Sequence, residues 1–238
     1  VAYTDAATGG VKIAISRNGG STFSTKGLGS TTNTISDGKA GLPSVSVYGS
    51  LVVVAWTADA HGKVVAKVSR DAGKTWAGNT LATTAQGYAT THVAGGRLSV
   101  AWPTADGLAI RTWTAARWGP VVAIAPPGAP ATYAWYGTPA IALRGTSQAA
   151  AAWSACHADC SSATPKVDLV WSESTDGGAS FGHAQVIVDG TAGGATYPQN
   201  WYPSIVWASA TTRYITYTAE TLGDGVYTVQ FRTGSGTP

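Results

Sequence analysis

The amino-acid sequence predicts an all-β protein, because its composition, its lack of helical patterning and its internal repeats all favour strands. Only 11% of the 238 residues are charged, while 44% are hydrophobic and 10% are aromatic. Val, Ile, Thr, Trp and Tyr are abundant, which is typical of β-sheets and excludes the aromatic-poor composition of disordered chains. No long segment carries apolar positions at helical spacing. The length suffices for one well-filled domain.

A strand motif recurs along the chain. Each copy is a run of small and β-branched residues that ends on an aromatic residue and precedes a polar turn. The aromatic residues are Tyr3, Trp56, Trp102, Trp153 and Tyr217, at intervals of 53, 46, 51 and 64 residues. Such a period indicates a solenoid or a propeller. We therefore expect a single domain of five units, approximately residues 1–38, 39–84, 85–130, 131–192 and 193–238.

A turn motif recurs with the same period. It reads Ser-Arg-Asn-Gly-Gly-Ser-Thr-Phe at 16–23, Ser-Arg-Asp-Ala-Gly-Lys-Thr-Trp at 69–76 and Ser-Thr-Asp-Gly-Gly-Ala-Ser-Phe at 174–181. The first two copies lie one period apart and the third lies two periods further on. Residues 113–118 hold a shortened copy without the acid. The two periodic signals agree in register.

This turn resembles the Asp-box, or bacterial neuraminidase repeat, of pattern Ser-x-Asp-x-Gly-x-Thr-Trp. The resemblance implies a sialidase-like β-propeller in which each box joins the third and fourth strands of a blade, on the face away from the active site. We expect the acid to cap backbone N–H groups, the glycine to adopt positive φ and the aromatic residue to pack between blades. The corresponding residues are Ser16, Asn18, Gly20, Phe23, Ser69, Asp71, Gly73, Trp76, Ser174, Asp176, Gly178 and Phe181.

Units two to four each contain four predicted strands, and units one and five each contain three. In the second unit these are Pro43–Val47, Leu51–Trp56, Val64–Ser69 and the segment after the box. The chain opens on a second strand and closes after a third strand. We expect a β-propeller of about five four-stranded blades, and the alternative is part of a propeller with six or seven blades. Further first strands are predicted at Tyr88–Val93, Pro139–Leu143 and Pro203–Trp207.

Charge and hydropathy exclude two classes of partner. The net charge is only +3 and no cluster holds more than two basic side chains, which argues against nucleic-acid binding. No apolar run is long enough to span a membrane. Met is absent and only two Cys occur, which favours an exported protein whose signal peptide has been removed. We expect a secreted bacterial protein.

Aromatic residues gather in the loops before the first strands, on the face opposite the boxes. Flat rings beside amide and carboxylate groups suit sugars, because C–H faces stack on rings while hydroxyls form hydrogen bonds. The alternative for any one ring is packing between blades. The candidate ligand-binding residues are Tyr88, Tyr133, Trp135, Tyr136, Tyr197, Asn200, Trp201 and Tyr202.

Four acids in the loops after the second strands are candidates for catalysis: Asp59, Asp106, Glu220 and Asp224. A glycoside hydrolase needs two carboxyl groups, about 5–5.5 Å apart for retention or about 6.5–9.5 Å for inversion. Glu173 lies beside a box, where a structural role is expected. The sialidase reaction is poorly supported, because the family's Tyr/Phe-Arg-Ile-Pro motif is absent and no arginine falls on the aromatic face.

The two cysteines lie in the segment Cys156-His157-Ala158-Asp159-Cys160. The two cysteines, the histidine and the aspartate of this segment lie so close in the sequence that they can rarely surround one zinc ion tetrahedrally. A local disulfide between Cys156 and Cys160 is therefore preferred over a metal site. No cofactor is expected, although a Ca²⁺ or Na⁺ ion in the propeller channel stays open.

These residues leave three functions open. The preferred one is a lectin-like module that binds a glycan or oligosaccharide. The alternatives are a glycoside hydrolase that acts through paired carboxylates and a scaffold that binds a protein partner, because one propeller fold supports all three.

Overall fold

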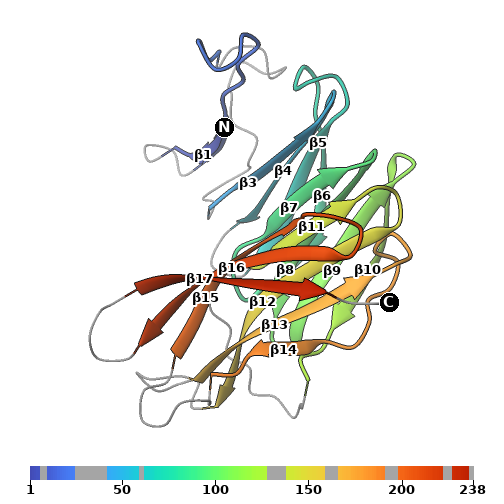
Figure 1. The fold of residues 1–238 in the computed structure, drawn as a ribbon. Coiled ribbons are helices and arrows are strands. Elements are labelled where there is room, and N and C mark those ends of the chain that lie inside the picture. Colours follow the sequence, from blue (N-terminus) through green and yellow to red (C-terminus); the bar gives the residue numbers. More distant parts are fainter. Residues whose placement is uncertain are drawn as a thin grey trace.

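A computed structural model describes residues 1–5, 10–24, 42–58, 62–127, 138–158, 166–190, 198–221 and 227–235. These residues form β-strands and turns without a helix. The strands follow one another as antiparallel meanders, which Figure 1 shows as successive twisted sheets. The described residues hold five blades or parts of blades, as the five repeats predict.

The blades differ in how many strands are described. Blade 1 contains β1 (Ala2–Thr4) and β2 (Val11–Ile13), followed by an isolated bridge between Ile15 and Ser24. Blade 2 contains β3 (Ser44–Tyr48), β4 (Leu51–Ala58), β5 (Lys63–Ser69) and β6 (Ala77–Ala82). Blade 3 contains β7 (Thr90–Ala94), β8 (Arg97–Thr104), β9 (Gly107–Thr114) and β10 (Arg117–Ile124). Blade 4 contains β11 (Ala140–Arg144), β12 (Gln148–Ala158), β13 (Lys166–Ser174) and β14 (Gln185–Val188). Blade 5 contains β15 (Pro198–Trp207), β16 (Thr212–Thr221) and β17 (Tyr227–Ser235).

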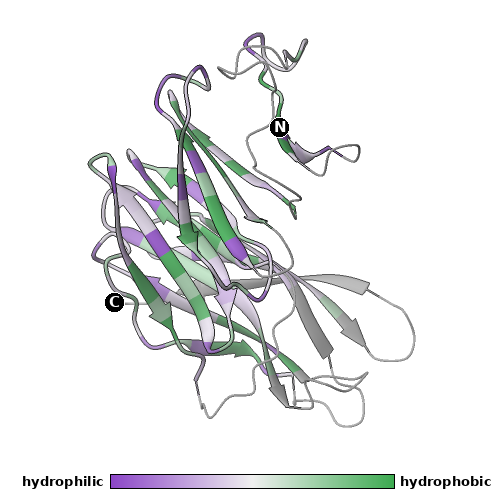
Figure 2. Ribbon diagram, turned by 180° about the vertical axis from the view of Figure 1, so that it is seen from behind, coloured by the Kyte–Doolittle hydropathy of each residue, from purple (hydrophilic) through white to green (hydrophobic). Residues whose placement is uncertain are grey.

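The core lies between the blades. Four clusters of buried residues join blades 1 and 2, 2 and 3, 3 and 4, and 4 and 5. Figure 2 shows the corresponding hydrophobic bands along the strands. The repeated aromatic residues Trp56, Trp102 and Trp153 are almost completely buried, whereas Tyr3 of blade 1 remains 38% exposed. Successive four-stranded sheets that pack face to face through their first strands form a β-propeller, which confirms the predicted fold class.

Side-chain hydrogen bonds connect the first strands of neighbouring blades. Ser46 Oγ of β3 donates to Thr91 O of β7 at 2.8 Å. The Leu143 amide of β11 donates to His92 Nδ1 of β7 at 3.2 Å, and Trp207 Nε1 of β15 donates to Ala142 O of β11 at 3.2 Å. These bonds fix the blades relative to one another where no sheet ladder could do so, since the first strands of adjacent blades belong to different ladders.

The first strand of blade 5 begins earlier than the sequence predicts. Residues Pro198–Tyr202 were expected to form a loop, but they belong to β15 and pair with β16. The register shifts between Trp201 and Ser204, and Tyr202 adopts a φ of 48° within this bulge. One parallel bridge, between Val167 and Gln199, also links β15 to β13 of blade 4. The prediction of a loop was wrong because pairing with two strands satisfies backbone groups that a loop would leave to solvent.

The three turn motifs have the same hydrogen-bonded conformation. Asp71 Oδ1 accepts from the backbone N–H groups of Lys74 and Thr75 at 3.0 and 2.8 Å, and Ser69 Oγ accepts from Gly73 N at 2.8 Å. Asp176 and Ser174 repeat these bonds in blade 4. In blade 1, Asn18 Oδ1 accepts from Thr22 N at 2.9 Å. The glycines at 20, 73 and 178 have φ between 87° and 92°, a region that favours glycine.

Two of these turns also contact the preceding blade. A Cβ placed on Gly73 would lie 2.3 Å from Ile15 Cδ1 of blade 1, and one on Gly178 would lie 2.7 Å from Thr112 Oγ1 of blade 3. The glycine therefore has two roles, because it adopts positive φ and lets the turn approach its neighbour. Gly20 has open space around it and serves only the first role.

Candidate functional site

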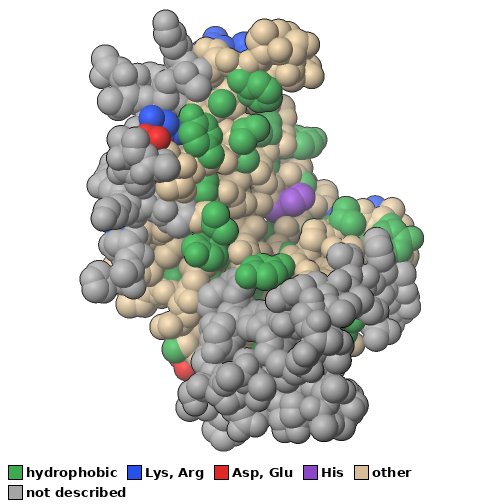
Figure 3. All heavy atoms as spheres, turned by 90° about the vertical axis from the view of Figure 1, so that its left-hand side faces the viewer, with side chains coloured by type: hydrophobic (Ala, Val, Ile, Leu, Met, Phe, Trp, Pro, Cys, Tyr) green, Lys and Arg blue, Asp and Glu red, His purple; other side chains and the backbone are tan. Residues whose placement is uncertain are grey.

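The two ends of the blades differ in chemistry. One end, the turn face, carries the three Asp-box-like turns and the connections between first and second strands. The other end, the loop face, carries the connections from second to third strands and from each blade to the next. Viewed from the left-hand side of Figure 1, the described surface carries separate patches of hydrophobic side chains among polar and backbone atoms, and charged groups are few (Figure 3).

The loop face contains a cavity of about 520 Å³ between blades 2 and 3. Its walls are apolar and include Trp102 and Leu108 of blade 3. Its polar groups come from the end of β8, from the β8–β9 turn and from the segment between β6 and β7. They are Thr83, Thr84, Thr104 and Asp106.

The segment between β6 and β7 is fixed by hydrogen bonds from both neighbouring blades. Thr57 Oγ1 at the end of β4 donates to Gly87 O at 2.6 Å and accepts from Ala89 N at 3.2 Å. Gln86 N donates to Pro103 O at the end of β8 at 2.9 Å. The segment thus presents Tyr88, which is 38% exposed, on a preorganised backbone.

Of the predicted ligand-binding residues, the structure describes the side chains of two. Tyr88 and Tyr202 are both exposed, Tyr202 by 62%. Asn200 and Trp201 are described as positions in β15, next to the bulge. The other predicted residues, Tyr133, Trp135, Tyr136 and Tyr197, lie outside the described residues.

Of the four candidate catalytic acids, Asp106 is exposed at the rim of the cavity on the loop face. Glu220 lies in β16 opposite Gln199, and only its backbone is described. Asp59 and Asp224 lie outside the described residues. Asp106 is therefore the one acid of this set whose side chain the structure places, together with three threonine hydroxyl groups.

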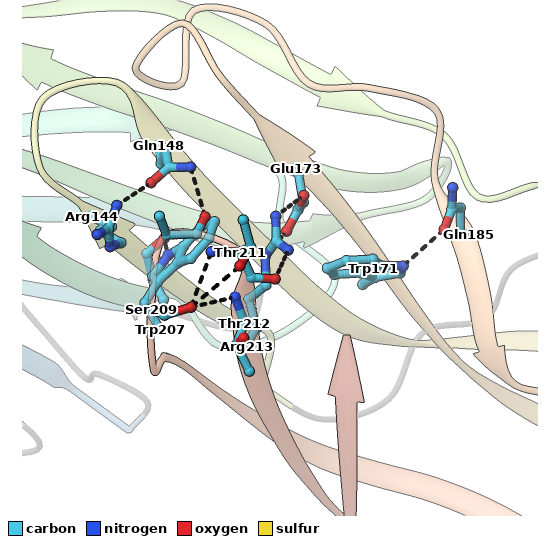
Figure 4. A network of polar contacts seen from close by, with 12 residues as sticks. Arg144, Gln148, Trp171, Glu173, Gln185, Trp207, Ser209, Thr211, Thr212 and Arg213 are labelled. Carbon is cyan, nitrogen blue, oxygen red and sulfur yellow. Dashed lines mark hydrogen bonds and ion pairs between the residues drawn. The ribbon is translucent and has the colours of Figure 1, made fainter. Parts of the chain in front are cut away.

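The turn face holds a polar cluster that the sequence pattern did not predict. Arg213 of β16 forms an ion pair with Glu173 of β13, and its guanidinium lies over the rings of Trp207 and Trp171, at 4.5 and 5.5 Å from their centroids (Figure 4). Arg213 is 3% exposed. Burial raises the pKa of the Glu173 carboxyl, and the Arg213 charge acts in the opposite direction. A cavity of about 550 Å³ adjoins the carboxylate.

The predicted cysteine pair is described only at one end. Cys156 is buried and is not a free thiol, and Cys160 lies outside the described residues. The disulfide therefore stays a prediction. In the part of the chain that the structure describes, no three His, Cys, Asp or Glu side chains gather as metal ligands would. The same residues include no helix that could cross a bilayer.

No protein-family model and no curated protein matches the chain. The fold is similar to that of an endo-arabinase from Bacteroides thetaiotaomicron, with a TM-score of 0.48 and 12% identity over 81% of this chain and 74% of that one. An α-L-arabinofuranosidase from Fusarium graminearum gives a TM-score of 0.48 and 13% identity over 81% of this chain and 62% of that chain. Hydrazine synthase from Kuenenia stuttgartiensis gives a TM-score of 0.50 and 12% identity over 82% of this chain and 51% of that chain. The chain thus spans between about half and three quarters of the length of these structures, and it resembles them at the level of the fold.

Proposed function

We propose that this chain is an Asp-box propeller that binds carbohydrate on its loop face. The observation that carries the proposal is the cavity of about 520 Å³, which Asp106 and the threonines at 83, 84 and 104 line together with apolar side chains. A sugar ring presents C–H faces to apolar surface and hydroxyl groups to carboxylate and hydroxyl partners. Tyr88, which follows Thr83 and Thr84 in the segment between β6 and β7, adds an exposed flat ring to the loop face.

The Asp-box assignment is supported by the hydrogen bonds of the turns. Three copies share the bond from the glycine amide to the serine hydroxyl and the bond from the amide of the seventh motif residue to the acid or amide side chain. Their glycines pack on the preceding blade in blades 2 and 4. These turns are structural in this proposal, and the ligand binds at the opposite end.

A glycan array with the purified protein tests the proposal, followed by titration calorimetry with the best ligand. Asp106→Asn and Tyr88→Ala are expected to weaken binding about tenfold each, because each removes a hydrogen-bonding or stacking partner. Trp135→Ala and Trp201→Ala test the predicted ring cluster in the same way. Tyr214→Ala is the matched control, because Tyr214 is 41% exposed on β16 and lies toward the turn face. The absence of binding to any glycan would contradict the proposal.

Glycoside hydrolysis is the second candidate, and the position of Asp106 at a cavity rim favours it. A second carboxyl group is required, and Asp59, Glu220 and Asp224 are the predicted partners. A hydrolase would release reducing sugar from the glycans that bind. Asp106→Asn would then abolish turnover while leaving a measurable affinity, whereas a lectin would show no turnover in the wild type.

We also propose that the protein is exported and that Cys156 pairs with Cys160. Mass spectrometry of the protein alkylated without a reductant tests this pairing. We expect no alkylation before reduction and two alkylated cysteines after it. Alkylation of both residues in the unreduced, unfolded protein would contradict the disulfide.

A further inference from the structure

One position in the repeat faces the next blade at the turn face. This position lies on the third strand, and in the sheet it is paired with the residue three places before the repeated aromatic residue of the second strand. The pairs are Val68 with Val53, Thr112 with Ser99 and Glu173 with Ala150. Ile15 holds the equivalent place before the first turn motif. Ile15 and Thr112 lie against the glycines of the following turn motifs, and Val68 is buried.

Blade 4 departs from this pattern because it carries Glu173 at this position. Among the described residues no glycine turn packs against this carboxylate, which forms the ion pair with Arg213 of blade 5. The guanidinium is held between the rings of Trp171 and Trp207, and Thr211 O accepts a further bond from it at 2.9 Å. Figure 4 shows this arrangement, in which the arginine reaches Glu173 from the side of blade 5.

The cavity of about 550 Å³ opens beside Glu173, and a smaller one of about 240 Å³ lies at the equivalent place between blades 3 and 4, beside Thr112. The wall of the larger cavity combines aromatic and polar groups: Trp171 and Phe181, then Thr175, His183 and Gln185. Gln185 Oε1 accepts from Trp171 Nε1 at 3.3 Å, so its amide N–H groups remain available. Among the described residues, neither the His183 imidazole nor the Thr175 hydroxyl has a hydrogen-bond partner, and both side chains are exposed.

We propose that this cavity, on the turn face and lined by Glu173, His183, Gln185 and Phe181, is a second carbohydrate site that takes an uncharged sugar ring. The carboxylate and the two side-chain donors supply hydrogen bonds for ring hydroxyls, while Phe181 and the edge of Trp171 supply apolar surface. The Glu173 and Arg213 charges balance each other, so neither a uronic acid nor an amino sugar gains a favourable partner. The site stands independently of the loop face, because its residues belong to the opposite end of the blades.

The His183 imidazole is the reporter that tests this site. The protein has four histidines, and a His183→Asn variant assigns its resonance in proton–nitrogen or proton–carbon NMR spectra. The probes are the methyl glycosides of glucose, galactose, mannose and arabinose, with glucuronate and glucosamine as charged controls. We expect a neutral glycoside to shift the His183 resonance saturably, and we expect the charged sugars to bind with an affinity lower by about tenfold or more.

Variants separate this site from the loop face. Gln185→Ala is expected to weaken the binding measured at His183 about tenfold, because it removes an amide donor from an exposed position. Glu173→Gln keeps the side-chain shape and is expected to weaken it further; its circular dichroism spectrum checks that the fold persists. Asp106→Asn should leave the His183 titration unchanged. The inference is overturned if no neutral glycoside shifts His183, if the charged sugars bind equally well, if Gln185→Ala leaves the affinity unchanged, or if Asp106→Asn abolishes the shift.

Discussion

At the scale of single residues, the turn motifs contain a natural comparison between an acid and an amide. Asp176 accepts from two backbone N–H groups with Oδ1 and from Ser180 Oγ with Oδ2 at 2.5 Å. Asn18 keeps the Oδ1 acceptor, but its Nδ2 donates to Thr22 Oγ1 at 2.8 Å, which reverses the last bond. The amide thus closes the same turn without a charge.

Asp176 should therefore contribute an acid-sensitive part of the stability. The hydrogen bonds that its carboxylate accepts, first of all the one from the Ser180 hydroxyl, lower its pKa from 3.8 to about 2. A lowered folded-state pKa means that the stabilisation is present above about pH 4 and is lost as the pH falls toward 2. We expect Asp176→Asn to flatten the decline in the free energy of unfolding over this window, in urea titrations at several pH values. Asp176→Ala should cost about 1 kcal/mol more than Asp176→Asn at pH 7, and equal costs would contradict the role of Oδ1.

His92 should give a second pH dependence in a different window. Its Nδ1 accepts from the Leu143 amide, and burial lowers the pKa of the imidazole below 6.5. The neutral ring is thus the stabilising form, and its contribution is lost as the pH falls below about 6.5. We expect the free energy of unfolding to fall between pH 7 and pH 5 by more in the wild type than in His92→Gln. The same pH dependence of the free energy of unfolding in both proteins would show that protonation of the imidazole does not affect stability.

At the scale of elements, the glycine turns connect neighbouring blades. Gly178→Ala brings a Cβ to 2.7 Å from Thr112 Oγ1, whereas the same change at Gly20 meets open space. Both residues have φ close to 90°, so both substitutions share the backbone cost of about 1–2 kcal/mol. We expect Gly178→Ala to be more destabilising than Gly20→Ala by about 1–3 kcal/mol in chemical denaturation, because the turn and β9 must move apart. Equal losses of stability in the two variants would mean that the turn does not pack tightly against blade 3.

The elements whose structure is local could be predicted from the sequence. The turn residues Ser69, Asp71 and Gly73 lie within five positions, so their bonds follow from the sequence pattern. The Glu173–Arg213 pair joins residues 40 positions apart in two blades. Only the departure of Glu173 from the apolar or small residues in the equivalent positions could have indicated it. The extension of β15 was missed because it depends on pairing with β13 and β16, which the alternation of apolar and polar residues within the segment does not reveal.

At the scale of the whole molecule, stability comes from packing between blades. The equivalent aromatic positions differ in burial: Trp102 is 1% exposed between blades 2 and 3, and Tyr3 is 38% exposed in blade 1. We expect Trp102→Ala to lower the free energy of unfolding by about 3–5 kcal/mol and Tyr3→Ala by about 1 kcal/mol or less. Thermal unfolding measured by calorimetry compares the two variants. A similar loss for both would contradict the account in which inter-blade burial sets the stability.

The same architecture gives the molecule two faces with different structures. The turn face repeats a local structural motif, and the loop face presents segments that the neighbouring blades hold in place, such as the one fixed by Thr57 and Pro103. Binding residues on rigidly held loops are the usual way in which a repeated scaffold acquires function. Two of the residues that the sequence assigned to this face, Tyr88 and Asp106, are exposed in the structure. The sequence did not indicate the cavity between blades 2 and 3, because its walls come from two separate units.

The most direct test of the proposed function is a crystal structure of the protein with the glycan that binds best in the array. We expect the sugar in the cavity on the loop face, with a hydroxyl group within hydrogen-bonding distance of Asp106 and the Thr84 hydroxyl close by. A glycan bound only at the turn face, or only at the outer strands away from Asp106, would contradict the assignment of the loop face as the principal binding site.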